Sequence, residues 1–437
     1  YYPSPVATDV LWQGNRFKMR LKKNFNLMAW MQGDTVIWMV FICLLMISVV
    51  EVYSASSTMS YGGKSSYWAP VMQHCSFWLV GVAAAWIVSR VPCNYFKLGG
   101  TLGLILAFFL QLLALTSGPI NGAGRWLRLW GLSFQPSEFT KISLVTYVAF
   151  IFATMRDDKG VSPLGTKMAL GGIVFALLLI VTENLSTAAL IFLIMLCMAF
   201  IAQVRTKLLA IVMACLIAVV TAGMVFAYQI PDSTLEVLKQ TDNKILHRVP
   251  TWVNRIREKH EIPQNPKDYD ITDNVQVTHA HIAVATSHVI GKGPGKSRQR
   301  DFLPQAYSDF IYAIIIEEMG IEGAIGVICL YLIFMWRCMK ISERCKSLFP
   351  SYLVMGLALM IVLQALVNMA VAVGAMPVTG QPLPLISRGG SSILINCVCV
   401  GMILSVSRTA KKIDDTADTV RKSPEASAAD ALAVSVP

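Results

Sequence analysis

A carboxylate opens one of the apolar segments of this 437-residue chain, and two more lie within the same segment. Asp309 begins DFIYAIIIEEMG, and Glu317 and Glu318 follow about 12 Å further along if the segment is helical. Ionised side chains next to hydrocarbon are costly and usually face a wet or protein-lined cavity. Asp309 is therefore a candidate general base, and its alternative role is to cap the helix, a role that Ser308 could also fill. For the two glutamates, a structural role is favoured slightly over lining the same cavity.

A glycine-rich basic loop leads into this segment. GKGPGKSRQR, residues 291–300, contains Lys292, Lys296 and Ser297. Glycine allows successive backbone N–H groups to converge on one anion, so the loop is a candidate site for a phosphate group. The alternative is an ordinary flexible basic loop, since the pattern is no Walker motif.

A second group of polar residues precedes another apolar segment. GRWLRLWGLSFQPSEFTK, residues 124–141, places Arg125, Glu138 and Lys141 near one membrane interface. Arg125 and Lys141 are candidate cations for a phosphate or pyrophosphate. For Lys141 the simple alternative is a side chain that extends along apolar surface to reach water.

A stretch rich in proline and glycine follows the ninth apolar segment. VGAMPVTGQPLPLISRGGSS, residues 373–392, cannot form a plain helix. Irregular backbone at membrane depth is tolerated only where protein or water lines it, so this stretch is predicted to wall a cavity. Gln364 and Asn368 share a face of the preceding helix, and Ser391 and Ser392 are added as candidate binding residues.

Histidine and cysteine patterns favour neither a metal site nor disulfides. His279 and His281 would point to opposite sides of a helix, and His288 adds no useful ligand spacing. The ten cysteines lie in or beside apolar runs and are expected to pack as small apolar residues.

Composition identifies a polytopic membrane protein. Apolar residues make up 55% of the chain, charged residues 14%, and the mean hydropathy is +0.57; soluble domains have about a quarter charged residues. Runs of membrane-spanning length predict an all-α fold of about ten transmembrane helices, at residues 35–53, 71–89, 98–116, 139–155, 165–182, 186–203, 207–228, 310–336, 352–376 and 391–407.

The positive charges set the orientation. The net charge of +11 reflects lysines and arginines gathered mainly on one side of the predicted spans, so nucleic-acid binding is not expected. Both termini are predicted to be cytoplasmic, as a segment of residues 1–34 and a disordered tail of residues 409–437 around a membrane domain of residues 35–408. The loop of residues 229–309 is then extracytoplasmic, with a short helix at 232–240 and an apolar-faced segment at 275–290 that lies along the membrane surface or dips into it.

Four motifs in this order resemble the SEDS family of bacterial proteins, which includes FtsW and RodA. They are VYSASS after the first span, GRW…QPSEFTK before the fourth, DFLPQAYSDFIYAIIIEEMG entering the eighth and NMAVAVGAMPVTGQPLPLISRGGSS before the tenth. The resemblance covers about residues 35–408, and PVTGQPLPLISRGGSS is closer to the division-type FtsW branch. Tyr307 and Arg388 stand where the family commonly has histidine and tyrosine.

The resemblance implies a peptidoglycan glycosyltransferase of the bacterial inner membrane that acts at the division septum. Its substrate would be lipid II, a disaccharide-pentapeptide on undecaprenyl pyrophosphate, and Asp309 would be the general base of an inverting transfer. It further implies a class B penicillin-binding protein and other divisome membrane proteins as partners. A divalent cation, Mg²⁺ or Mn²⁺, is a candidate helper, and no organic cofactor is expected.

Three other functions compete with this one. A lipid II flippase would not need Asp309 and would have cavity cations reachable from both sides. A secondary transporter would show inverted repeats with paired broken spans, which this sequence lacks. A division scaffold without catalysis would tolerate replacement of Asp309.

Overall fold

The computed structural model describes residues 31–55, 68–116, 127–129, 132–158, 160–181, 184–239, 249–250, 253, 275–302 and 308–410. The predicted N-terminal segment up to residue 30, the tail from residue 411, Arg125 and Tyr307 lie outside these residues.

All ten predicted spans are helices, which confirms the fold class. Eight of the described helices are long and apolar enough to cross a membrane. The other two predicted spans are α8, which is shorter, and α6, whose first two turns carry the charged residues Glu138 and Lys141. The ten are α3 (Thr35–Ala55), α4 (Trp68–Arg90), α5 (Asn94–Thr116), α6 (Pro136–Thr154), α7 (Pro163–Val181), α8 (Leu185–Ile201), α9 (Thr206–Gln229), α13 (Ile311–Glu343), α14 (Leu348–Ala372) and a last helix, Gly390–Ala410.

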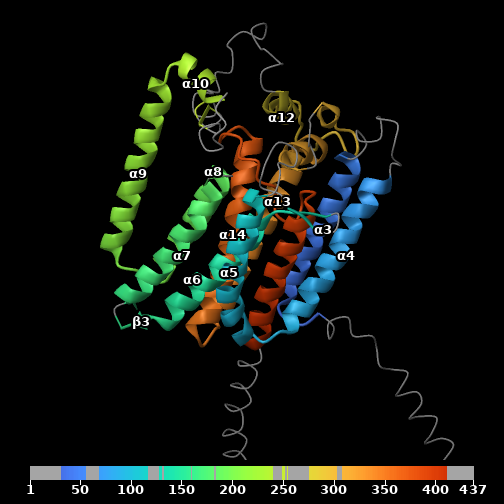
Figure 1. Cartoon of the computed structure of the whole chain (residues 1–437). Coiled ribbons are helices and arrows are strands. Elements are labelled where there is room, and N and C mark those ends of the chain that lie inside the picture. The colour runs from blue at the N-terminus through green and yellow to red at the C-terminus, as the bar shows by residue number, and fades with distance from the viewer. Residues whose placement is uncertain are drawn as a thin grey trace, which may run out of the picture.

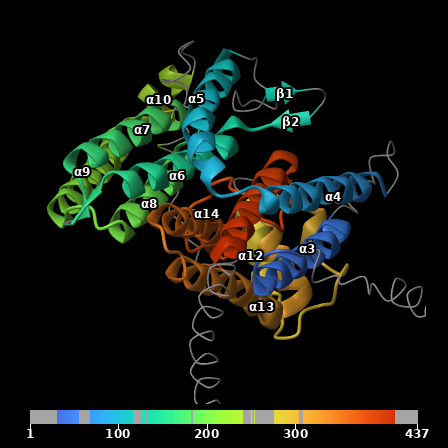
Figure 2. The same ribbon diagram turned by 90° about the horizontal axis from the view of Figure 1, so that it is seen from below.

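The core lies around α14 and the last helix. Their membrane-length windows are 72% and 78% buried within the protein, whereas that of α9 is 0% buried. The helix α14 packs against α13, α6 and α8, and α9 stands away from the bundle at one edge (Figure 1). Seen along the bundle, the last helix lies centrally, beside α14 (Figure 2). Because these two helices are central, polar groups on them are held within protein.

The two ends of the described chain meet at one end of the bundle. Arg408 donates from Nη1 to Oε1 of Gln32 at 3.0 Å, and Arg337 forms an ion pair with Asp34 at 2.7 Å. Arg337 lies near the end of α13, and Asp309 lies just before its first residue, so Asp309 is at the other end of this helix.

Two short hairpins were not predicted from the sequence. Strand β1 (Leu127–Leu129) pairs with β2 (Leu132–Phe134) before α6, and β3 (Arg156–Asp157) pairs with β4 (Gly160–Val161) after it. In the first hairpin, LRL and LSF alternate apolar and polar residues, the period-2 pattern of a strand.

The segment between α9 and α13 has further helices: α10 (Asp232–Lys239), α12 (Val275–Ala285) and the short 3₁₀ helix η4 (Gln299–Asp301). The first confirms the short helix predicted at 232–240. The helix α12 packs against α13, α14 and η4, and Ala280 and Ala283 are fully buried. Its apolar face is therefore covered by protein.

Candidate functional site

Asp309 lies immediately before α13, half-buried. The N-cap position belongs to Phe310, whose carbonyl oxygen accepts from Ala313 N at 3.0 Å, so neither Ser308 nor Asp309 occupies it. The Ser308 hydroxyl instead donates to Asp309 Oδ1 at 2.8 Å, and Asn368 Nδ2 donates to the Asp309 carbonyl oxygen, also at 2.8 Å. A neighbouring side chain and a buried amide thus fix the carboxylate and its backbone.

The proline- and glycine-rich stretch after α14 folds against Asp309. Ser387 Oγ donates to the Ser308 carbonyl oxygen at 2.6 Å, and a Cβ placed on Gly380 would lie 3.6 Å from Asp309 Oδ2. Gly380 has a φ of 65°, which glycine adopts without strain. The stretch therefore borders the candidate base.

Side chains from several helices satisfy the irregular backbone of this stretch. Asn368 Nδ2 donates to Gln381 O at 2.7 Å, and Gln364 Nε2 donates to Pro382 O at 3.0 Å. The Tyr331 hydroxyl donates to Pro384 O. The predicted shared face of Gln364 and Asn368 is thus confirmed, and each amide replaces a hydrogen bond that a helix would have made.

Lys141 is buried within the protein, so the simple alternative of a side chain that extends to water is wrong. Its Nζ lies 2.8 Å from Glu138 Oε1 and donates to Gln364 Oε1 at 2.7 Å; Lys141 and Glu138 are 2% and 3% exposed. The ion pair arises because Glu138 is one helical turn before Lys141, while α14 supplies the amide. Lys141 is thereby neither a cation extending to water nor one open to a large ligand.

The helix α14 joins this ion pair to the candidate base. Gln364 contacts Lys141 and Asn368 contacts the Asp309 backbone. The two amides are four residues apart, about 6 Å along the helix axis. One turn of a buried helix thus contacts both Lys141 and the Asp309 backbone.

Glu317 is fully buried and receives the basic loop. Lys292 Nζ lies 2.6 Å from Glu317 Oε1. The backbone N–H groups of Arg298 and Gln299 donate to its two oxygens at 3.2 and 3.3 Å, and Ser297 Oγ donates as well. These contacts support the structural role that the sequence slightly favoured for Glu317.

Glu318 receives the same loop from the other side. Gly295 N donates to Oε2 at 2.8 Å and Ser297 N donates to Oε1 at 3.2 Å. The Ser54 hydroxyl, from the end of α3, also donates to Oε1, and Arg300 Nη1 lies 3.9 Å away. The loop thus forms the predicted anion cradle, but the anions in it are the protein's own carboxylates.

Two glycines allow the loop to approach α13. Gly320 interrupts α13 with a φ of 71° and a ψ of −171°. A Cβ there would lie 2.2 Å from Val289 O, and one on Gly291 would lie 2.3 Å from Gly320 N. Larger residues at either position would separate the loop from the helix.

The side chains of the remaining candidate residues lie outside this cradle. Lys296 and Arg298 point outward and are exposed. The Ser391 hydroxyl accepts from Gln135 N at 3.4 Å, and Ser392 Oγ accepts from Asn396 Nδ2 at 3.3 Å. Both serines are 8% exposed; the Ser391 contact joins the last helix to the residue before α6, whereas the Ser392 contact lies within the last helix.

The histidines make contacts of other kinds. His279 Nδ1 is 2.7 Å from Gln299 Oε1, and its ring stacks on Phe302 at 5.2 Å. Across the described ranges, no group of three histidine, cysteine, aspartate or glutamate residues could hold a metal ion. All ten cysteines are free thiols.

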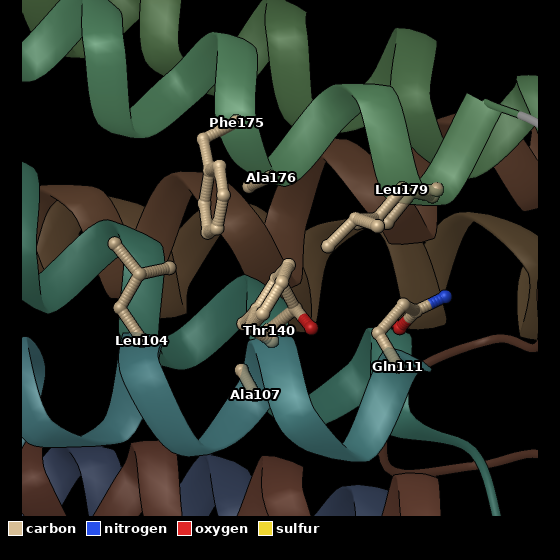
Figure 3. Close-up of a pocket in the computed structure, with 9 residues that line it drawn as sticks. Leu104, Ala107, Gln111, Thr140, Phe175, Ala176 and Leu179 are labelled. Atoms are coloured by element: carbon tan, nitrogen blue, oxygen red, sulfur yellow. The ribbon is translucent and has the colours of Figure 1, made fainter. Parts of the chain in front are cut away.

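A small apolar pocket between α5, α6 and α7 is unsuited to a substrate. It has a volume of about 10 Å³, and Leu104, Gln111, Thr140 and Phe175 are among the side chains around it (Figure 3). That volume holds one water molecule. The pocket lies on the side of α6 that faces α5 and α7, whereas Lys141 faces α14.

Sequence reasoning missed three buried polar residues in the first two helices. Ser48 Oγ donates to Ile386 O at 2.6 Å and lies 2.9 Å from His74 Nε2. Glu51 is fully buried, and neither of its carboxylate oxygens has a hydrogen-bond partner among the residues described. Their signal was simple, since each is a polar residue inside an apolar run.

Comparisons with known proteins agree with the motifs. Residues 34–412 match the model of the FtsW/RodA/SpoVE family, described as cell cycle proteins. The chain is 29% identical to a probable peptidoglycan glycosyltransferase FtsW of Trichlorobacter lovleyi, over 90% of this chain and 96% of that protein. It is 30% identical to the one of Coxiella burnetii, over 83% and 93%.

Among solved structures, the fold is similar to a chain of a peptidoglycan synthase complex. The TM-score is 0.66 at 20% identity, over 86% of this chain and 98% of that chain. Ten helices in the predicted order, the four motifs and the family match over nearly the whole chain agree. The protein belongs to the FtsW/RodA/SpoVE family of cell cycle proteins.

Proposed function

We propose that the protein is a peptidoglycan glycosyltransferase that polymerises lipid II during cell division, with Asp309 as its general base. The observation that supports this most is the position of Asp309. It lies at one end of a membrane-spanning helix, held by Ser308 and Asn368 and bordered by the irregular stretch at Gly380. The sugar of a lipid-linked substrate lies at the membrane boundary, and a carboxylate there can take the proton that the acceptor hydroxyl must lose.

The transfer is a single displacement. The 4-hydroxyl oxygen of the acceptor sugar attacks the anomeric carbon of the donor, and its proton passes to the Asp309 carboxylate. The bond from that carbon to the undecaprenyl pyrophosphate oxygen breaks, and the leaving group keeps the electron pair. Because the attack is in line, an α-linked donor gives a β-1,4 bond.

Ser308 and Asn368 orient the base. The Ser308 hydroxyl donates to Oδ1, which leaves the Oδ2 side of the carboxylate directed toward Gly380. Asn368 fixes the backbone from a buried helix, so the carboxylate needs little reorganisation when the proton arrives. An Asn368→Ala variant would free this backbone without touching the carboxylate.

Exposed cations suit the departing pyrophosphate better than buried ones. Lys296 and Arg298 lie on the loop that leads to Asp309 and are exposed, whereas Lys141 is closed off by Glu138 and Gln364. Positive groups held in place stabilise the charge that develops on a leaving group. Arg125, which lies outside the described residues, remains a candidate from its position in the sequence.

Among the described residues, the predicted divalent cation finds no ready site. The described residues contain no group of three side chains that could bind a metal ion, and Glu317 and Glu318 are occupied by the loop. Mg²⁺ usually binds together with substrate phosphates rather than in an all-protein cage. The steps above therefore use only the chain's own residues.

The proposal extends to the setting of the enzyme. A class B penicillin-binding protein is the expected partner, with other divisome proteins, in the inner membrane at the septum and with both termini cytoplasmic. The nearness of Gln32 and Arg408 supports termini on one side. The likeness to a chain of a peptidoglycan synthase complex supports the partner class.

Reconstitution tests the proposed reaction. The purified protein in nanodiscs, with and without its transpeptidase partner, is given fluorescent lipid II and a divalent cation. Glycan ladders that a muramidase digests are expected. Transfer of lipid II across vesicles without any ladder would identify a flippase instead, and neither activity would favour the scaffold.

A further inference from the structure

The loop of residues 288–301 is tied to α13 more tightly than an exposed basic loop needs to be. Two backbone hydrogen bonds join the loop directly to α13: Lys292 N donates to Glu317 O at 3.0 Å, and Gly293 N donates to Glu318 O at 2.8 Å. The carboxylates of the same two glutamates then accept four further N–H groups of the loop. Six of the loop's amides are thus committed to two adjacent residues.

The pattern along the loop alternates between inward and outward residues. Ser297 points inward, is 3% exposed and donates to Glu317 through its hydroxyl. Lys296 and Arg298, on either side of it, are exposed. The backbone beneath each cation is fixed, because Gly295 N and Ser297 N flank Lys296, and Arg298 N itself donates to Glu317.

A second attachment joins the loop to α3. Arg300 Nη1 donates to Ser54 O at 3.1 Å and to Ser54 Oγ at 2.9 Å, and it lies 3.9 Å from Glu318 Oε1. The Ser54 hydroxyl donates to the same carboxylate. Helices α3 and α13 therefore hold the loop from two directions.

We propose that Glu317 and Glu318 are positioning residues that hold Lys296 and Arg298 as a preorganised site for a pyrophosphate group. This rests on the proposed glycosyl transfer, in which a pyrophosphate leaves near Asp309. Cations fixed in advance stabilise developing charge without a cost of reorganisation at the moment of reaction. The buried carboxylates supply that fixation and do not touch the substrate.

Replacing either glutamate with glutamine should release the loop. Both oxygens of each carboxylate accept N–H groups from the loop. A glutamine would replace one of these oxygens with an NH₂ group, which is a donor and would face a loop N–H group that is also a donor. Glu322 offers a matched control, because it is exposed on the same helix. The full chain in nanodiscs is compared as wild type, Glu317→Gln, Glu318→Gln and Glu322→Gln.

Hydrogen–deuterium exchange tests the attachment without any need for activity. Peptides covering residues 291–300 should exchange at least about tenfold faster in Glu317→Gln and Glu318→Gln, since these amides lose their acceptors. The wild type and Glu322→Gln should match. Unchanged exchange in both variants would overturn the attachment.

A double-mutant cycle with lipid II tests the positioning role. Glu318→Gln is expected to lower kcat by about tenfold or more with little change in KM. In a Lys296→Ala, Arg298→Ala background the same substitution should have almost no further effect, because the cations it positions are gone. Multiplicative losses would show a merely structural glutamate and overturn the proposal. If the wild type makes no polymer, the proposed transfer fails, and the exchange experiment still decides the attachment.

Discussion

The ion pair between Glu138 and Lys141 should contribute strongly to stability, because neither charge can reach water. The two side chains are 3% and 2% exposed, with Nζ and Oε1 2.8 Å apart, and Lys141 also donates to Gln364 at 2.7 Å. Lys141→Met removes the cation and leaves a buried carboxylate without its partner. Such a loss costs about 3–5 kcal/mol of the free energy of unfolding.

The double variant Glu138→Gln, Lys141→Met should be more stable than the single Lys141→Met. Removing both charges of a buried pair is often neutral or stabilising, because no uncompensated charge remains in a low-dielectric interior. We expect the second substitution to restore at least about 2 kcal/mol of the loss. The coupling free energy between the two sites should therefore be large.

An exposed pair on α13 provides the matched control. Lys340 and Glu343 are also three residues apart and 2.9 Å from each other, but they are 44% and 63% exposed. Their coupling should be only about 0.2–1 kcal/mol. Denaturant unfolding in micelles, followed by tryptophan fluorescence, gives both cycles. Additive effects at Glu138 and Lys141, or a coupling no larger than that of the exposed pair, would refute the reasoning.

Three further predictions concern other parts of the molecule. Gly320→Ala should lower stability in thermal unfolding by at least about 2 kcal/mol, because its Cβ would meet a carbonyl oxygen at 2.2 Å; Gly326→Ala, with nothing within 4 Å, should be tolerated. Burial raises the pKa of the Cys93 thiol to about 12 and that of Cys345 to about 11. Thiolate is the reactive form, so mass spectrometry should find both unlabelled by maleimide near neutral pH until the protein is denatured. Glu51→Met should not lower the melting temperature, because both Glu51 oxygens lack a hydrogen-bond partner within the described ranges. A lower melting temperature in the variant would contradict this and show that the carboxylate has a stabilising partner.

The helices could be predicted from the sequence because hydrophobic length is a local property. Each of the ten apolar runs became a helix within four residues of its predicted bounds, except that α13 continues to Glu343, seven residues past its predicted end. The start of α8 is also set by neighbouring residues, since Asn184 Oδ1 accepts from Thr187 N at 3.1 Å. The first β-hairpin was missed because its three-residue strands are too short to stand out.

The site could be predicted only in part, because its contacts join distant residues. Lys141 and Glu138 are one turn apart, so their pairing was open to prediction, but Gln364 is 223 residues from Lys141. Burial of the lysine depends on that amide. The local pattern therefore left open a lysine that reaches water, whereas the fold buries it.

The glycine-rich loop shows the same limit. Its converging N–H groups were predicted from Gly291 and its neighbours, and they do surround anions. Glu317 and Glu318 occupy them because the break at Gly320 brings the loop onto α13. A count of the nearby charges, with two adjacent buried carboxylates beside a basic loop, was the available signal.

Polymerisation of lipid II by the Asp309→Asn variant tests the central claim most directly. The amide keeps the shape of the side chain and can still meet Ser308, but it cannot accept the proton. Asp158→Asn, at an exposed carboxylate between β3 and β4, is the matched control. With equal folded protein and the partner present, Asp309→Asn should polymerise at least about 10²-fold more slowly than wild type, and Asp158→Asn should equal it. Equal glycan ladders from Asp309→Asn and wild type would contradict Asp309 as the base.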